Sequence, residues 1–210
     1  MKEYDKLVAQ QLLQINAIKL NPAKPFTWAS GWKSPIYCDN RKTLSYPEVR
    51  NLIRDSFAEI IKNKYPETEG IAGVATGAIA HGILVADILN LPFIYIRSSA
   101  KSHGMENMIE GEYSAGQKFV VVEDLISTGG SSLRAVEALR NAGCKVLGMV
   151  AIFTYGFPKA VDNFFTAKCG LDTLSNYDSL IDQAVITGYV SDNDVETLKK
   201  WRQDPDRWNV

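Results

Sequence analysis

The sequence has little cysteine and no long apolar run. Among its 210 residues are only three cysteines, which are widely spaced and form no C-x-x-C pair. Neither a disulfide framework nor a zinc site is indicated, and a reducing cytoplasm is the predicted location. The N-terminal stretch is amphipathic and polar, and no run of about 18 apolar residues occurs, so we expect neither secretion nor a membrane span. The cysteines are Cys38, Cys144 and Cys169.

The sequence has no excess of charge of either sign. Lys and Arg number 23 against 24 Asp and Glu, a formal net charge of -1. Proteins that bind nucleic acid or anionic membranes usually carry a basic excess, so we expect neither partner. Any anionic ligand must therefore be held by groups local to its site. With 46% hydrophobic and 22% charged residues, the composition is that of a globular protein.

The first third of the chain has helix signals at its start and at its end. Apolar residues near helical spacing predict a helix over residues 3–20, which the prolines of NPAKP end. Residues 21–46 are rich in aromatics and turn residues, and we expect irregular structure or short strands there. Pro47 suits the first turn of a helix that runs to about Tyr65.

Short apolar runs then alternate with turn and helix signals. The runs are continuous rather than alternating, which is typical of parallel strands covered on both faces. The β-α-β-α order predicts an α/β fold with a mostly parallel central sheet flanked by helices. No repeat or linker divides the chain, so we expect a single domain over 1–210, ending in a helix with Ser191 as its N-cap. The expected strands are 70–74, 92–97, 118–123 and 145–153.

The stretch VVVEDLISTGGSS, residues 120–132, carries the strongest functional signal. In open α/β sheets, ligands bind beyond the carboxyl ends of the strands. Residues 124–130 have that position, between the strand 118–123 and a helix expected to begin near Ser131. Hydroxyls and sterically open backbone N–H groups at a helix N-terminus favour a phosphate. These groups belong to Ser127, Thr128, Gly129, Gly130 and Ser131.

Two carboxylates, Glu123 and Asp124, come directly before this loop. They would repel a phosphate, so we expect them to accept hydrogen bonds from hydroxyls one ring away or to face a cation-like centre. A phosphorylated ribose has both features. The alternative is an ordinary Gly/Ser turn whose acid only caps the helix. The loop matches neither G-x-x-x-x-G-K-[ST] nor G-x-G-x-x-G, which removes the main support for an ATPase or a dinucleotide-binding protein.

This string resembles the phosphoribosyl pyrophosphate (PRPP) signature of type I phosphoribosyltransferases. FTWASGWKSPIYCDNR and YIRSSAKSHGMENMIEG are similar to the base-side segment and the mobile loop of the orotate phosphoribosyltransferase family, so the resemblance spans most of residues 20–155. It implies the type I fold, with an N-terminal helix and small hood at about 1–45 and the core and C-terminal helices at about 46–210. The implied reaction converts PRPP and orotate to orotidine 5′-phosphate and pyrophosphate in UMP biosynthesis, with Mg²⁺ as cofactor.

A cationic segment follows the strand 92–97 and carries Arg97, Lys101 and His103. It lacks an apolar pattern, which predicts a flexible arm whose cations neutralise a leaving pyrophosphate and exclude water. A solvated charged loop is the alternative. In the family that the chain resembles, the matching residues bind PRPP, and the lysine and histidine reach into the neighbouring subunit's site. The resemblance therefore implies a homodimer, with Lys101, His103 and Asp124 as catalytic residues.

The resemblance assigns PRPP binding to a dozen residues and no metal ligand with certainty. They are Arg97, Lys101, His103, Glu123, Asp124, Leu125, Ile126, Ser127, Thr128, Gly129, Gly130 and Ser131.

A third segment, GVATGAIAHG, follows the strand 70–74 and places Gly73, Thr76 and Gly77 before a helix. It resembles the family's pyrophosphate loop, whose backbone amides face the diphosphate. Gly77 stands where some orotate enzymes have a lysine, so that contact is not expected here. His81, one helical turn on, is expected to be a structural helix residue.

The base site is expected in SGWKSPIYCDN. Orotate is a planar pyrimidine with a carboxylate, so it needs an apolar or aromatic wall, hydrogen bonds and a positive or N–H-rich spot. Lys33, Tyr37 and Ser127 are the expected contacts. Two positions depart from the family pattern: Ala29 replaces a lysine, and Tyr155 stands where an arginine often meets the orotate carboxylate. Ser34 and Ile36 are further candidates, and Trp28, Trp32 and Arg41 serve either packing or a dimer interface.

Two alternatives remain open from the sequence. A type I transferase for a purine base would share the PRPP loop and differ in its hood. A non-catalytic regulator with the PRPP fold would bind nucleic acid, which the near-neutral charge and the set of Arg97, Lys101 and His103 argue against.

Overall fold

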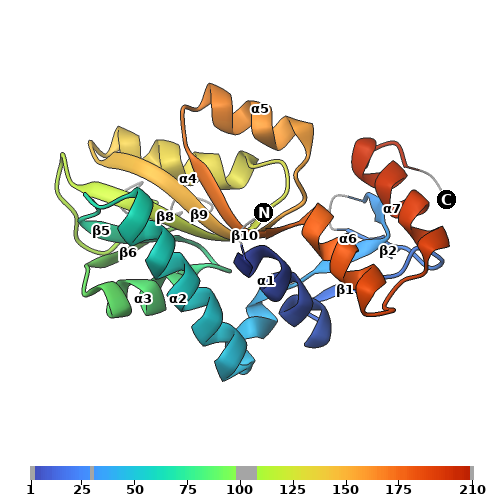
Figure 1. The fold of residues 1–210 in the computed structure, drawn as a ribbon. Helices are drawn as coiled ribbons and strands as arrows, with labels where there is room; N and C mark the ends of the chain where they lie inside the picture. Colours follow the sequence, from blue (N-terminus) through green and yellow to red (C-terminus); the bar gives the residue numbers. More distant parts are fainter. Residues whose placement is uncertain (1–2, 29–30, 98–107, 209–210) are drawn as a thin grey trace.

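The computed structural model describes residues 3–28, 31–97 and 108–208, and its centre is a six-stranded sheet (Figure 1). The strand order is β10-β9-β8-β5-β6-β7, and all neighbours are parallel except β7, which runs antiparallel to β6. The mostly parallel sheet predicted from the sequence is confirmed. The strands are β5 (Gly70–Val74), β6 (Phe93–Ile96), β7 (Ile109–Glu110), β8 (Lys118–Ile126), β9 (Lys145–Thr154) and β10 (Leu171–Asn176).

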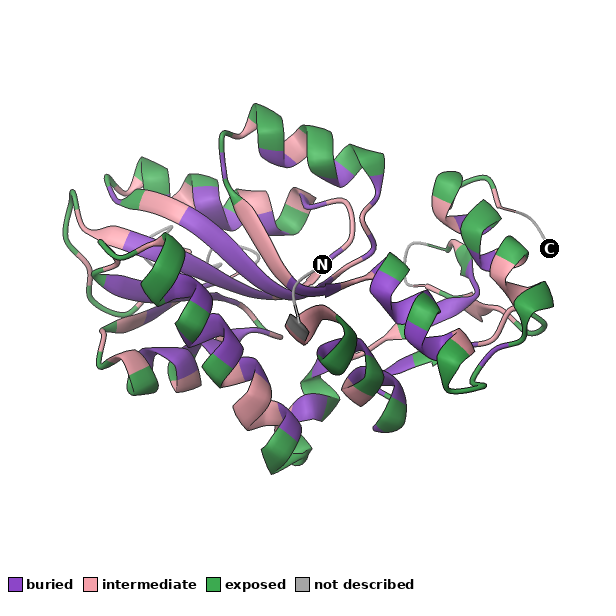
Figure 2. Ribbon diagram, in the orientation of Figure 1, coloured by how far each residue is buried: buried purple, intermediate pink, exposed green. Residues whose placement is uncertain are grey.

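Helices cover both faces of the sheet. On one face lie α1 (Glu3–Gln14), α2 (Pro47–Lys64) and α3 (Ile79–Leu89), and on the other lie α4 (Gly130–Asn141) and α5 (Pro158–Thr166) (Figure 1). Strand β8 shows the consequence. Its alternate side chains enter the two cores in turn, so the strand is buried on both sides (Figure 2) and its sequence is a continuous apolar run. Val120 and Val122 face one core, and Phe119 and Val121 face the other.

A smaller group of elements lies beside the β10 end of the sheet, to the right in Figure 1. Two short antiparallel pairs, β1–β4 and β2–β3, meet the C-terminal helices there. The Trp28 ring packs edge-on against Trp201, with ring centroids 5.6 Å apart. The N-terminal segment, for which the resemblance implies a hood, is therefore in contact with the C-terminal helix α7. The elements are β1 (Ile18–Leu20), β2 (Phe26–Thr27), β3 (Lys33–Ser34), β4 (Ile36–Cys38), the 3-10 helix η1 (Asn40–Ser45), α6 (Tyr177–Ile186) and α7 (Asp192–Gln203).

The first helix is shorter than its sequence pattern predicts. It ends at Gln14, because Asn16 takes a left-handed conformation with φ 55° and residues 18–20 pair with β4 as strand β1. The apolar residues after Gln14 happen to continue the helical spacing, but they are buried because they belong to a strand that pairs with β4. The prediction of a helix over 3–20 was wrong beyond Gln14.

Two helix ends match their sequence signals. Helix α2 begins at Pro47 and is capped at its other end by Tyr65, and α7 begins after Ser191, whose backbone N–H donates to the Asp194 carboxylate at 3.0 Å. The edge strand β10 and the helix α6 carried no sequence signal strong enough to predict. Within the described part of the chain, no helix is long and apolar enough to cross a membrane.

Strand β8 continues three residues past the expected end at residue 123. Its pairing with β5 stops at Gly73↔Val122, whereas its pairing with β9 continues to Ile126↔Thr154. Glu123 lies in the strand as predicted, but Asp124 also lies inside the strand and not in the loop after it, which corrects the prediction for Asp124. The carboxyl end of β8 extends past the carboxyl end of β5. The candidate site forms in the space beyond the carboxyl end of β5.

Candidate active site

The loop from β8 to α4 is held tightly at the helix N-terminus. Gly129 is the N-cap of α4 with φ 80°, and a Cβ at this position would come within 2.8 Å of the Phe164 ring. Only glycine fits both the conformation and the space. The next carbonyl back, that of Thr128, accepts a hydrogen bond from Asn163 Nδ2 at 2.8 Å. The loop therefore presents a fixed helix N-terminus, as a phosphate site requires.

The two acids of β8 differ sharply in environment. Glu123 is only 5% exposed, its Oε2 accepts from Ser132 Oγ at 2.7 Å, and its Oε1 accepts from the backbone N–H of Asp124 at 2.9 Å. Burial, with the neighbouring Asp124 charge as the second cause, raises the pKa of Glu123 to about 8. Asp124 is half-buried. The sequence did not distinguish the two acids, nor did it reveal that Ser132 is the partner of Glu123.

The loop after β5 touches the second acid. A Cβ built on Gly77 would lie 2.2 Å from Asp124 Oδ2, so the glycine backbone and the carboxylate are packed against each other. The segment also contains a cis peptide bond between Ala75 and Thr76. The structure thus brings the expected diphosphate loop next to the expected ribose-binding acid. A lysine at position 77 would displace the Asp124 side chain.

A cavity of about 250 Å³ lies between the hood and the end of β8. Among the described residues its lining offers aromatic faces and hydroxyls and no charged side chain. The rings of Trp28 and Tyr155 are 5.2 Å apart at their centroids. Burial raises the pKa of the Tyr155 hydroxyl well above its ordinary value, so this group stays a neutral hydrogen-bond donor. The lining residues are Thr27, Trp28, Tyr37, Cys38, Leu125, Ser127 and Tyr155.

Two of the three expected base contacts, Tyr37 and Ser127, line this cavity. The third, Lys33, does not line it. Lys33 Nζ donates to Thr27 Oγ1 at 2.9 Å, so it contacts one residue of the cavity lining. Thr27 and Cys38 were not singled out from the sequence. Nothing in the local pattern marks them, because the β2–β3 hairpin and β4 bring them to the end of β8.

The cationic segment is described only at its start. Arg97 follows β6, and its Nη1 lies 3.5 Å from Glu110 Oε1. Lys101 and His103 lie outside the described residues, as does Ala29. His81 lies in α3, 1% exposed, where burial lowers the pKa of its imidazole to about 4.

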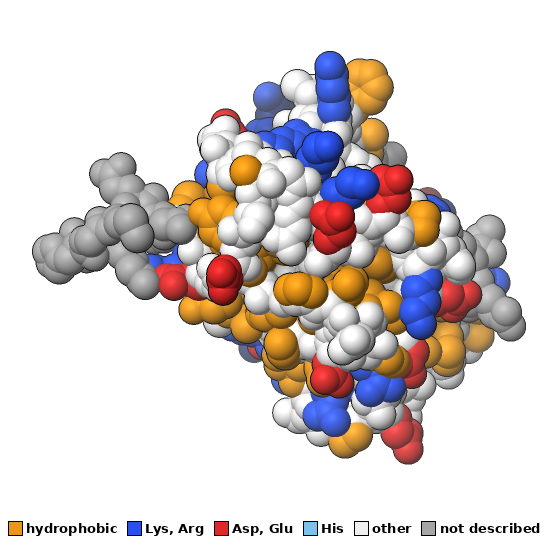
Figure 3. Space-filling view, turned by 90° about the vertical axis from the view of Figure 1, so that its left-hand side faces the viewer, with side chains coloured by type: hydrophobic (Ala, Val, Ile, Leu, Met, Phe, Trp, Pro, Cys, Tyr) orange, Lys and Arg blue, Asp and Glu red, His pale blue; other side chains and the backbone are white. Residues whose placement is uncertain are grey.

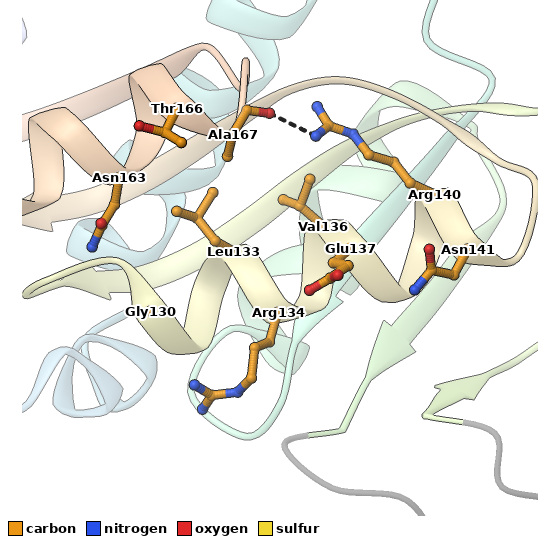
Figure 4. A pocket seen from close by; sticks show the side chains of 10 residues that line it. All are labelled: Gly130, Leu133, Arg134, Val136, Glu137, Arg140, Asn141, Asn163, Thr166 and Ala167. Atoms are coloured by element: carbon orange, nitrogen blue, oxygen red, sulfur yellow. Dashed lines mark hydrogen bonds between the residues drawn. The ribbon is translucent and has the colours of Figure 1, made fainter.

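A larger hollow of about 520 Å³ lies elsewhere, between α4 and α5 (Figure 4). Figure 4 shows Leu133 and Val136 directed toward α5, with Asn163 beside them. Neither acid of β8 lines it, and it lies along the helices that cover one face of the sheet. It shares Gly130 with the loop before α4, and Asn163, which also lines it, donates a hydrogen bond to the carbonyl of Thr128.

Sequence and structure are both similar to known proteins. The family model described as the phosphoribosyl transferase domain matches residues 42–169. The orotate phosphoribosyltransferase of Porphyromonas gingivalis is 59% identical over 210 residues, which cover 100% of both chains. That of Phocaeicola vulgatus is 60% identical over 100% of this chain and 99% of its own. The crystal structure of orotate phosphoribosyltransferase from Aeropyrum pernix shares the fold, with a TM-score of 0.76 over 88% of this chain and 99% of that chain at 24% identity.

Proposed function

The chain belongs to the orotate phosphoribosyltransferase family, and we propose that it transfers the ribose 5-phosphate group of PRPP to orotate, forming orotidine 5′-phosphate and pyrophosphate for UMP synthesis. One observation carries the proposal: the fixed helix N-terminus of α4, the Asp124 carboxylate and the Gly77 loop meet beside an aromatic cavity. The identity of 59–60% to orotate phosphoribosyltransferases over the full length of the chain favours this function over a purine-base transferase and over a regulatory protein.

The helix N-terminus of α4 is assigned to the 5′-phosphate of PRPP. Backbone N–H groups and hydroxyls at this end carry partial positive charge, and the helix dipole adds to it. The left-handed Gly129 and the Asn163 bond to Thr128 hold the loop in place before any ligand binds. Binding then costs little ordering of the loop. The phosphate contacts come from Ser127, Thr128, Gly129, Gly130 and Ser131, with Leu125 and Ile126 leading into them.

The ribose hydroxyls are assigned to Glu123 and Asp124. As pyrophosphate leaves, positive charge develops at the anomeric carbon, and a carboxylate near the ring stabilises that charge more than it stabilises the ground state. Asp124 is the more exposed of the two acids. Glu123 lies deeper, where Ser132 and the Asp124 N–H already bond its oxygens.

The cavity of about 250 Å³ is assigned to orotate. Trp28 and Tyr155 supply flat apolar faces for a planar ring, and hydroxyls supply the hydrogen bonds. Ser127 belongs to both the phosphate loop and the cavity, so it places the base next to the ribose. Lys33 adds positive charge behind Thr27, which suits the anionic end of the base.

The residues present fit a Mg²⁺ ion carried in by the substrate. Mg²⁺ is usually held by one or two carboxylates plus substrate phosphates, not by an all-protein cage. Among the described residues no three metal-binding side chains gather, yet the Asp124 carboxylate lies against the Gly77 loop that we assign to the diphosphate. Asp124 would hold the ion. When bound, the ion neutralises charge on the departing pyrophosphate.

A homodimer is the proposed assembly, with Lys101 and His103 reaching the neighbouring subunit's site. Helix α3 leaves two large apolar side chains open, with Ile83 47% and Ile88 41% exposed. Figure 3 views the molecule from the side where β6 and α3 lie and shows hydrophobic side chains gathered over its lower half. The cationic segment starts at Arg97, directly after β6 at this side of the sheet.

All three cysteines are free thiols, in keeping with the cytoplasmic location that we propose.

The direct test is an assay of the pure protein with PRPP and Mg²⁺ and one of three bases. Loss of the ultraviolet absorbance of orotate, with pyrophosphate released in equal amount, is the expected result. Turnover of adenine or hypoxanthine in place of orotate would identify a purine enzyme. Binding of RNA or DNA without pyrophosphate release would identify a regulator.

A further inference from the structure

The end of β8 that projects past β5 is met by a side chain from the hood. Asp124 lies beyond the last β5–β8 pair, Gly73↔Val122, and its backbone carbonyl accepts a hydrogen bond from Asn40 Nδ2 at 2.6 Å. Asn40 is the first residue of η1 and is 1% exposed. The Asn40 side-chain amide thus donates to a carbonyl that has no partner from β5. The bond joins two segments that are 84 residues apart in the chain.

Two further polar groups of Asn40 are also bonded. Its Oδ1 accepts from Cys38 Sγ at 3.3 Å, which sets the orientation of the amide because oxygen can only accept. Cys38 lines the cavity assigned to the base. The backbone carbonyl of Asn40 accepts from Thr43 Oγ1 at 2.5 Å. One residue therefore contacts both the base cavity and the strand that carries the ribose acid.

The same chain of bonds continues to the diphosphate loop. Thr43 gives its hydroxyl hydrogen to Asn40, so its oxygen must accept from His81 Nε2, 3.1 Å away. His81 is neutral because of its burial, and this bond selects the tautomer with hydrogen on Nε2. His81 lies four residues after Gly77, at the start of α3. The loop assigned to the diphosphate is thereby linked to η1.

We propose that Asn40 is a positioning residue that holds the base cavity, Asp124 and the diphosphate loop in register for phosphoribosyl transfer. The inference rests on the proposed function. Transfer requires the base, the anomeric carbon and the leaving group to align, and these three subsites are built on separate segments. A shift of about 1 Å in such an alignment costs on the order of 100-fold in rate. Because Asn40 is only 1% exposed, it acts through Asp124, Cys38 and Thr43 and not on the substrate directly.

A purely structural role predicts a different outcome. Buried polar clusters also stabilise folds, and loss of one partner then lowers the melting temperature. In that case each folded molecule would still turn over at the normal rate. Turnover per folded molecule, measured well below the melting temperature, separates the two roles.

The experiment replaces Asn40 by aspartate, which keeps the shape but removes the amide N–H that donates to the Asp124 carbonyl. We expect Asn40→Asp to remain folded and to lose about 10- to 100-fold in kcat. Asn193→Asp makes the same chemical change at an exposed position of the first turn of α7, and we expect its kcat to stay within about twofold of the wild type. A folded Asn40→Asp protein with wild-type kcat and KM overturns the inference.

A second pair of variants decides the matter if Asn40→Asp does not fold. Thr43→Val keeps the shape and loses the hydroxyl, whereas Thr43→Ser keeps the hydroxyl. We expect a lower kcat for valine and a near-normal kcat for serine; equal values in the folded proteins overturn the inference.

The wild type, assayed beside them, tests the proposed function separately. If it uses a base other than orotate, calorimetric binding of PRPP carries the test, and undiminished PRPP affinity of Asn40→Asp or Thr43→Val overturns the inference.

Discussion

The backbone of Gly77 lies against the carboxylate of Asp124, so closely that a Cβ at position 77 would be 2.2 Å from Oδ2. Gly77 lies in the loop after β5, whereas Asp124 lies inside β8, near its end. Their contact joins the loop assigned to the diphosphate with the acid assigned to the ribose. Glycine at this position is thus a requirement of the site and not of the backbone conformation.

Gly77→Ala should lower activity more than stability. The added methyl group meets the end of a side chain, so Asp124 can rotate away at modest cost, but its carboxylate then leaves the ribose. We expect kcat to fall by about 10- to 100-fold, with a melting temperature within a few degrees of the wild type. Gly170→Ala is the matched control, since its Cβ would have its nearest neighbour at 3.5 Å. Equal kcat values for the two variants would contradict the assignment of Asp124.

The burial of Glu123 should make stability depend on pH. Its pKa of about 8 lies above the value of 4.5 for an exposed glutamate, so the folded protein binds this proton more tightly than the unfolded protein does. The contribution to stability is complete below about pH 4.5 and is lost as the pH rises through about 8. Glu123→Gln removes this dependence. Denaturant unfolding at pH 5 and pH 9 should show the wild type losing a few kcal/mol more than the variant; parallel losses would refute the prediction.

Tyr155→Phe tests the base cavity. The hydroxyl of Tyr155 is the only group removed, and its aromatic packing against Trp28 and Trp201 remains. A hydrogen bond to a charged ligand contributes about 1.5–3 kcal/mol, so we expect KM for orotate to rise by about 10-fold or more. KM for PRPP should stay the same. An unchanged KM for orotate would place the base elsewhere.

Lys101→Ala should lower turnover by orders of magnitude and leave the fold intact, because we propose that the lysine acts on the leaving pyrophosphate. Lys62→Ala, on the exposed side of α2, is the control. Subunit mixing then tests the reach across the dimer. Lys101→Ala subunits and Asp124→Asn subunits, each inactive alone, should recover about a quarter of wild-type activity when mixed, since half of the dimers have one complete site. No recovery would mean that Lys101 serves its own subunit.

The apolar face of α3 should form the dimer contact. Ile83→Glu places a charge on that face, and we expect a monomer in sedimentation velocity with little remaining activity. Val161→Glu makes the same change on α5, where the valine is 63% exposed, and should leave the dimer intact. A dimeric Ile83→Glu protein would show that the subunits meet at another surface.

Much of the architecture is encoded locally. The continuous apolar runs at β5, β6, β8 and β9 predict buried parallel strands because both faces of each strand need apolar side chains. The loop of hydroxyls and glycines before α4 likewise predicts an anion site, since a helix N-terminus attracts negative charge wherever it lies. Those features depend on residues that are neighbours in the chain, and the chain order therefore shows them.

Other features exist only through contacts between distant segments. The end of α1 at Gln14 depends on pairing between β1 and β4, and the length of β8 depends on β9 outlasting β5. The different burial of Glu123 and Asp124 could not be read from two adjacent acids, because it is set by Ser132 below one and Gly77 beside the other.

By itself, then, the sequence determined the class of fold, the family and the loop that we assign to the phosphate. The tertiary structure decided which acid is buried, which hydroxyls line the cavity that we assign to the base, and that Asn40 meets Asp124. The physical reason is that burial and hydrogen bonding act on groups close in space, whatever their separation along the chain.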